Sequence, residues 1–66
     1  MRRGTIKSEL IKTIGWNNDK MEVEYHDGTI FVYFKVPLST FRAIVRSKHP
    51  GTDWIKLRDQ YTFEEV

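Results

Sequence analysis

The sequence contains no cysteine, which excludes disulfide bonds and thiolate metal sites. No apolar run approaches the roughly 20 residues that a membrane-spanning helix needs. The opening Met-Arg-Arg is not followed by the apolar segment of a secretory signal. Since a chain without cysteine also fits a reducing compartment, we expect a cytoplasmic protein that does not contact membranes.

The residues that usually carry catalysis or bind metals are few and scattered. His26 and His49 have no second histidine or carboxylate at ligand spacing, so we expect no metal. Ser8, Ser39 and Ser47 lack the flanking motif of a nucleophile. The four glycines are dispersed and form no phosphate-binding loop. We therefore expect no catalytic residue, no cofactor and no enzymatic activity.

What the chain does contain suffices for one small domain. It has 66 residues, of which 39% are apolar, and it includes two Trp, three Tyr and four Phe. A domain of this size buries only about 60% of the surface of its unfolded chain, so it needs most of these side chains in its core. Eleven Lys and Arg against nine Asp and Glu give a net charge of +2, which is weak evidence for a polyanionic partner.

Three stretches have the composition or alternation of strands, namely residues 10–16, 20–25 and 29–36. Turn-forming residues separate them at 17–19 and 26–28. In the second stretch Glu22 and Glu24 lie on the face opposite to Val23, and we interpret them as a solvated face rather than a carboxylate dyad. The third stretch is almost entirely apolar, so we expect both of its faces to be covered.

Helical spacing follows the third strand. Pro37 suits a first helical turn and Ser39 is a competing N-cap, ahead of an apolar stripe at Leu38, Phe41, Ile44 and Val45. We expect Pro50 and Gly51 to end this helix and Thr52 to cap a short second one through Trp54, Ile55 and Leu57. Residues 60–63 alternate as either a last strand or an extended tail. The predicted fold is α+β: an antiparallel three-stranded meander, with or without a fourth C-terminal strand, packed against one main and one short helix.

The turn at residues 26–28 decides which aromatic side chains are exposed. A two-residue loop would place Phe31 and Tyr33 outside, on the face of the glutamates. A three-residue loop with a left-handed Gly28 pairs Val23 with Phe31 and turns both rings into the core. We favour the three-residue loop, because then only the glycine needs a positive φ. The second face of the strand would then be covered by the C-terminal rings of Trp54, Tyr61 and Phe63.

Three short elements together resemble the KTSC domain, a module named after the C-terminal region of some lysyl-tRNA synthetases. Residues 31–37 read FVYFKVP, where the family has Tyr-x-Tyr-Phe-x-Val-Pro. Residues 14–16 read IGW and residues 57–63 read LRDQYTF, similar to its flanking elements. The resemblance spans about residues 8–63. Phe31 replaces the first tyrosine of the central motif and Thr62 replaces a proline of the last element.

Residues 1–8 show little patterning, so we expect a flexible N-terminal segment there, followed by one KTSC-like domain over residues 9–66. The family is not a known enzyme class, and its synthetase context implies RNA binding. The candidate nucleic-acid-binding residues are Arg42, Arg46, Lys48, Lys35 and Lys56, with exposed rings among Trp16, Tyr33 and Trp54 for stacking. The alternative interpretation gives these residues structural roles. Cations at the C-terminal end of a helix are stabilised by the helix dipole, and Arg42 pairs with a strand glutamate. The aromatic rings then belong to the core.

We therefore predict a small non-enzymatic module that binds RNA or another nucleic acid. The alternative is a protein-interaction module, such as a regulator or inhibitor of a bacterial or phage-targeted machine. Its basis is the small size, the nearly balanced charge and an uncovered apolar face. A third hypothesis is a pocket for a nucleotide-like molecule, which requires a concave site made of aromatic rings and an arginine.

Overall fold

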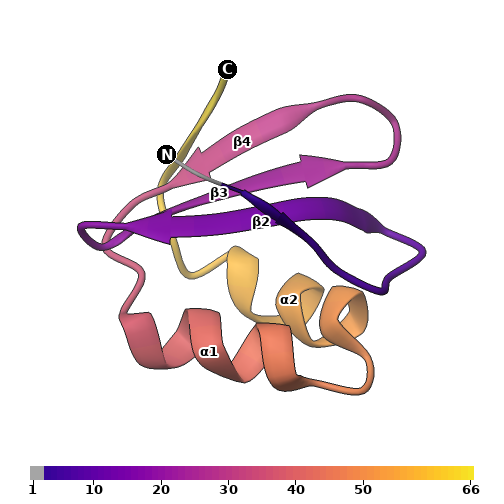
Figure 1. The fold of residues 1–66 in the computed structure, drawn as a ribbon. Helices are drawn as coiled ribbons and strands as arrows, with labels where there is room; N and C mark the ends of the chain where they lie inside the picture. The colour runs from indigo at the N-terminus through magenta and orange to yellow at the C-terminus, as the bar shows by residue number, and fades with distance from the viewer. Residues whose placement is uncertain (1–2) are drawn as a thin grey trace.

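The computed structural model describes residues 3–66, and its strands form one antiparallel five-stranded sheet in the order β1-β2-β3-β4-β5. The strands are β1 (Gly4–Thr5), β2 (Ile11–Asn17), β3 (Lys20–Tyr25), β4 (Ile30–Tyr33) and β5 (Phe63–Glu65). Helices α1 (Leu38–Arg46) and α2 (Pro50–Arg58) lie between β4 and β5 in the chain, and both pack on the same side of the sheet (Figure 1). The expected α+β meander is confirmed, and the C-terminal segment is a strand.

The turn between β3 and β4 is the three-residue loop that the sequence favoured. Gly28 N–H donates to Tyr25 O at 3.0 Å, and Tyr25 N–H donates to Thr29 O at 2.9 Å. Only the glycine of this loop has a positive φ, of 93°. Val23 therefore pairs with Phe31, and the side chains of these partners share the face under the helices.

The core lies between this face and the helices. Its fully or nearly fully buried side chains come from three strands, both helices and the segment after β4; they are Ile11, Ile14, Met21, Val23, Tyr25, Tyr33, Val36, Ile44 and Trp54. No charged side chain of residues 3–66 is buried with them. The alternation in β3 explains the pattern, because Met21, Val23 and Tyr25 point inward while Glu22 and Glu24 do not.

Strand β4 is shorter than the sequence predicted, and its second face is not covered by the helices. The strand ends at Tyr33 because Lys35 adopts a left-handed φ of 57°, which turns the chain toward α1. The predicted cover by Trp54, Tyr61 and Phe63 is wrong. Trp54 and Phe63 contact the ring of Tyr33 on the helix side of the sheet, and Tyr61 stacks on Trp54.

Strand β1 was not predicted. Gly4 and Thr5 pair with Ile14 and Thr13 of β2, within the segment for which we predicted flexibility at residues 1–8. Ser8 then accepts hydrogen bonds from the backbone N–H groups that lead into β2. Residues 1–2 of the predicted flexible segment lie outside the described part of the chain.

The helix boundaries differ from the prediction mainly between the two helices. Pro50 and Gly51 do not end the first helix; α1 stops at Arg46, and Pro50 is the first residue of α2. Thr52 therefore lies inside α2, and its predicted capping role is wrong. At the start of α1, Pro37 rather than Ser39 occupies the N-cap position. Neither helix in the described residues has the length and apolar character to cross a membrane.

Candidate nucleic-acid interface

The outer face of α1 carries the first two candidate cations. Ile44 is buried and Phe41 packs against the core, so the opposite face of this amphipathic helix points to solvent. Arg42 and Arg46 are exposed there, one turn apart. With Leu38, Ser39 and Ala43 they line a shallow groove of about 430 Å³. No acidic residue lies in α1, so the two arginines are the charged groups of the groove.

Lys48 lies at the adjoining corner of the molecule. It lines a hollow of about 660 Å³ together with Lys7, Glu9 and His49, between the segment before β2 and the start of α2. Lys48 follows α1 by two residues but does not line the groove of Arg42 and Arg46. Lys35 and Lys56 are exposed but line neither of these two hollows.

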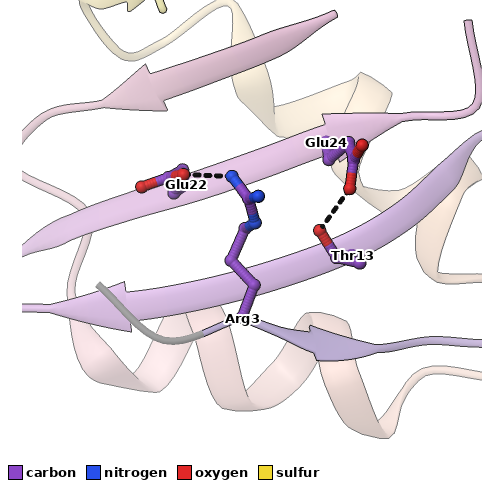
Figure 2. Close-up of polar contacts among 4 residues, drawn as sticks. All are labelled: Arg3, Thr13, Glu22 and Glu24. Atoms are coloured by element: carbon purple, nitrogen blue, oxygen red, sulfur yellow. Dashed lines mark hydrogen bonds and ion pairs between the residues drawn. The ribbon is translucent and has the colours of Figure 1, made fainter. Parts of the chain in front are cut away.

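The cations of α1 are not neutralised by acids. Among the described residues, the ion pair within 4 Å joins Arg3 to Glu22, on the sheet face away from the helices (Figure 2). Glu24, on the same face, accepts a hydrogen bond from Thr13. The alternative in which Arg42 pairs with a strand glutamate is therefore wrong. Positive charge lies on α1, and the glutamates lie on the opposite side of the sheet.

Two of the three candidate rings are not available for stacking. Tyr33 is 3% exposed and Trp54 is fully buried, so the prediction that they form an exposed platform is wrong. Their polar atoms bind inside the core: the hydroxyls of Tyr25 and Tyr33 are 2.6 Å apart, and Trp54 Nε1 donates to Tyr25 Oη at 3.2 Å. Trp16 is half-buried, and its Nε1 donates to Val36 O at 2.7 Å.

Burial changes the chemistry of the tyrosine pair. Desolvation, followed by the hydrogen bond with Tyr25, raises the pKa of Tyr33 above its ordinary value. Contact with the Tyr25 hydroxyl likewise raises the pKa of Arg58, whose guanidinium carbon lies 6.0 Å from the centroid of the Tyr25 ring. The phenol of Tyr33 therefore stays protonated at neutral pH, and Arg58 stays charged.

Another concave site contains aromatic rings and an arginine, as the third hypothesis requires, but its position was not predicted from the sequence. Phe31, Tyr33 and Phe63 form a pocket of about 240 Å³ with Arg58 and Asp59 at the end of α2. The signal that was present is the interleaving of aromatic and cationic residues over 54–63. Within the described residues, no group of three or more His, Asp or Glu is placed to hold a metal ion.

A comparison with protein families identifies the family of this chain. The family model of the KTSC domain matches residues 7–52, which run from the segment before β2 to the first turn of α2. The matched span includes the central 31–37 motif and all of α1, whereas the third similar element, residues 57–63, lies beyond it. A search of curated proteins gives no significant match. Since the match covers more than half of the chain, this protein belongs to the KTSC domain family.

Proposed function

We propose that this domain is a non-enzymatic RNA-binding module of the cytoplasm that contacts phosphates through Arg42, Arg46 and Lys48. The observation that supports this function best is the exposed, unneutralised pair of arginines in the groove of α1. Arginine donates in a planar fork that matches phosphate oxygens, so two arginines one turn apart suit adjacent contacts on a backbone.

The arrangement is also unfavourable unless a partner compensates it. Like charges four residues apart on a helix destabilise it by a few tenths of a kcal/mol. The positive charge of Arg46 is stabilised by the negative C-terminal end of α1, but Arg42 lies in the second turn, away from that end. An anion bound in the groove would relieve the repulsion between the two side chains. The domain makes these contacts without the rings of Tyr33 and Trp54, which are buried.

The test is a titration of the domain with single-stranded RNA over a range of salt concentrations. Binding through phosphates loses affinity with a log–log slope of about −0.7 for each contact to a single strand. The double variant Arg42→Ala and Arg46→Ala should bind weakly and reduce the slope by about 0.7 for each contact that it removes.

The matched control removes the same charge elsewhere. Lys12 and Lys20 are exposed on β2 and β3, so the Lys12→Ala and Lys20→Ala double variant has the same net charge as the arginine variant. It should keep the wild-type slope. A flat salt dependence of the wild-type domain, or equal losses in the two double variants, would refute the proposal.

One observation favours protein binding as the second candidate function. The helices cover only one face of the sheet, so Ile30 and Val32 of β4 are half-buried on the other face, beside Glu22 and Glu24. In this alternative the domain regulates or inhibits a larger bacterial or phage-targeted machine by docking this face. Its binding would be nearly independent of salt, and a tagged copy would retain a specific host protein that Val32→Lys releases.

A further inference from the structure

We infer that the pocket formed by Phe31, Tyr33, Phe63, Arg58 and Asp59 binds a single unpaired guanine base. This inference deepens the proposed function, on which its role in RNA recognition rests. The pocket itself can be tested with a free nucleotide, without any contact to α1.

The size and walls of the pocket select a flat ring. Its volume of about 240 Å³ is below the range of about 300–1,000 Å³ typical of drug-sized ligands, so it suits one ring system rather than a longer segment of RNA. Phe31 and Phe63 meet edge to face with centroids 5.4 Å apart. Phe63 is 57% exposed, so part of its ring is free to stack on a base.

The charged groups at the pocket are the guanidinium of Arg58 and the carboxylate of Asp59. The hydroxyl of Tyr33, by contrast, is hydrogen-bonded to Tyr25 inside the core. Arg58 adds a guanidinium that has no carboxylate within 4 Å in the described residues. The ligand edge that meets Arg58 must therefore offer hydrogen-bond acceptors.

Asp59 adds the one strong acceptor of the pocket, and this distinguishes the bases. Guanine presents O6 and N7 as paired acceptors, which is the usual bidentate partner of arginine, and its N1–H and N2–H₂ are donors for a carboxylate. Adenine presents its N6–H₂ donor where guanine has O6, so that donor would face Arg58 without an acceptor. The combination of Arg58 and Asp59 therefore favours guanine over adenine.

The experiment titrates the full chain with guanosine 5′-monophosphate and, separately, adenosine 5′-monophosphate, and follows the backbone amides by ¹⁵N NMR. We expect the guanosine nucleotide to bind about 5- to 150-fold more tightly, the range that one bidentate contact gives. The largest shifts should fall at Arg58, Asp59 and Phe63. Equal affinities, no binding of the guanosine nucleotide, or shifts confined to α1 would overturn the inference.

Two conservative variants test the residues. Phe63→Leu keeps apolar bulk at an exposed position but removes the ring, and Arg58→Lys keeps the charge but removes the fork. Each should reduce the preference for guanine to less than about threefold while the amide spectrum stays dispersed as in a folded chain. An unchanged preference in both variants would also overturn the inference.

The α1 variant separates this inference from the proposed function. Arg42→Ala with Arg46→Ala should lose RNA affinity but bind the free guanosine nucleotide as the wild type does. Phe63→Leu should show the opposite pattern. The salt dependence of its RNA affinity should be unchanged, and its preference for guanine should be lost. RNA binding without a base preference would refute the pocket alone, and nucleotide binding without a salt-dependent RNA complex would refute the α1 interface alone.

Discussion

The hydroxyl groups of Tyr25 and Tyr33 share a 2.6 Å hydrogen bond across two neighbouring strands, inside the core. The two residues are on β3 and β4, and Trp54 of α2 donates to the same network. The contact therefore joins α2 to the centre of the sheet by polar as well as apolar contacts. In a domain of this size, hydrogen bonds that contribute about 1 kcal/mol each are a substantial part of the total stability.

The raised pKa of Tyr33 predicts a loss of stability in alkaline solution. Below pH 10 the phenol is neutral in both the folded and the unfolded chain, so its contribution is fully present. Above pH 10 the unfolded chain loses the proton while the folded one keeps it, so the free energy of unfolding should fall. One such group accounts for at most about 1.4 kcal/mol per pH unit. Urea denaturation at a series of pH values from 8 to 12 measures this slope.

The variant Tyr33→Phe provides the comparison. It removes the ionisable group and one hydrogen bond, so it should be less stable than the wild type at pH 8 by about 1–3 kcal/mol. Its stability should then decline less steeply above pH 10. Parallel curves for the two proteins would show that the pKa of Tyr33 is the same in the folded and the unfolded chain.

The β3–β4 turn predicts a specific requirement for glycine. Gly28 has a φ of 93°, and an alanine there would be strained although no atom lies within 4 Å of its Cβ. We expect Gly28→Ala to lower the free energy of unfolding by about 1–3 kcal/mol. Gly4→Ala is the matched control, because its Cβ also meets no atom within 4 Å and its φ is not in the left-handed region. That variant should remain within about 0.5 kcal/mol of the wild type.

Gly51 is required for a different reason, the close approach of α2 to the segment before β2. A Cβ at this position would lie 2.6 Å from Ser8 Oγ and 3.1 Å from Leu10 Cβ. Ser8 Oγ is held by two backbone N–H donors, so it cannot move away without losing them. We expect Gly51→Ala to destabilise the domain by about 1–3 kcal/mol, measured by thermal or urea unfolding.

A double-mutant cycle with Ser8→Ala tests this steric explanation. The serine variant loses two hydrogen bonds but also removes the oxygen with which the new methyl group collides. Gly51→Ala should therefore cost at least about 0.5 kcal/mol less in the Ser8→Ala background than in the wild type. Additive effects would mean that Ser8 is not the obstacle.

The ion pair between Arg3 and Glu22 predicts a small, salt-dependent effect. Both side chains are partly exposed, at 26% and 19%, so the pair is screened by solvent. We expect Arg3→Ala to lower stability by no more than about 1 kcal/mol in low salt, and by less at 1 M salt. Thermal unfolding at both ionic strengths measures the difference; a loss that does not depend on salt would point to packing of the arginine stem instead.

The parts of the fold that could be predicted from the sequence are those governed by neighbouring residues. The alternation over 20–25 determined the inward face of β3, and the residues His26, Asp27 and Gly28 determined the turn. From that turn the burial of Tyr33 followed, because a register fixes the face of every side chain. The predicted register therefore also argued against Tyr33 as an exposed ring on which a base could stack.

The errors concern features that depend on distant contacts. Pro50 suits both the end of one helix and the start of the next, and local sequence does not say which. The left-handed conformation of Lys35, which ends β4, has no glycine or asparagine to signal it. Packing of Trp54 and Phe63 on one side of Tyr33 required knowledge of where the chain returns after α2. The position of the pocket beside Arg58 could not be predicted for the same reason.

The strand order has a consequence for how the chain acquires its structure. Three of the four strand pairings join segments that are adjacent in sequence, and the exception, β4 with β5, brackets both helices. Short-range pairings close small loops and form rapidly, so β1 to β4 can assemble while the rest of the polypeptide is still unstructured. Docking of β5 is then the slow, late step, and a chain halted before residue 63 would expose the edge of β4 to association with other copies.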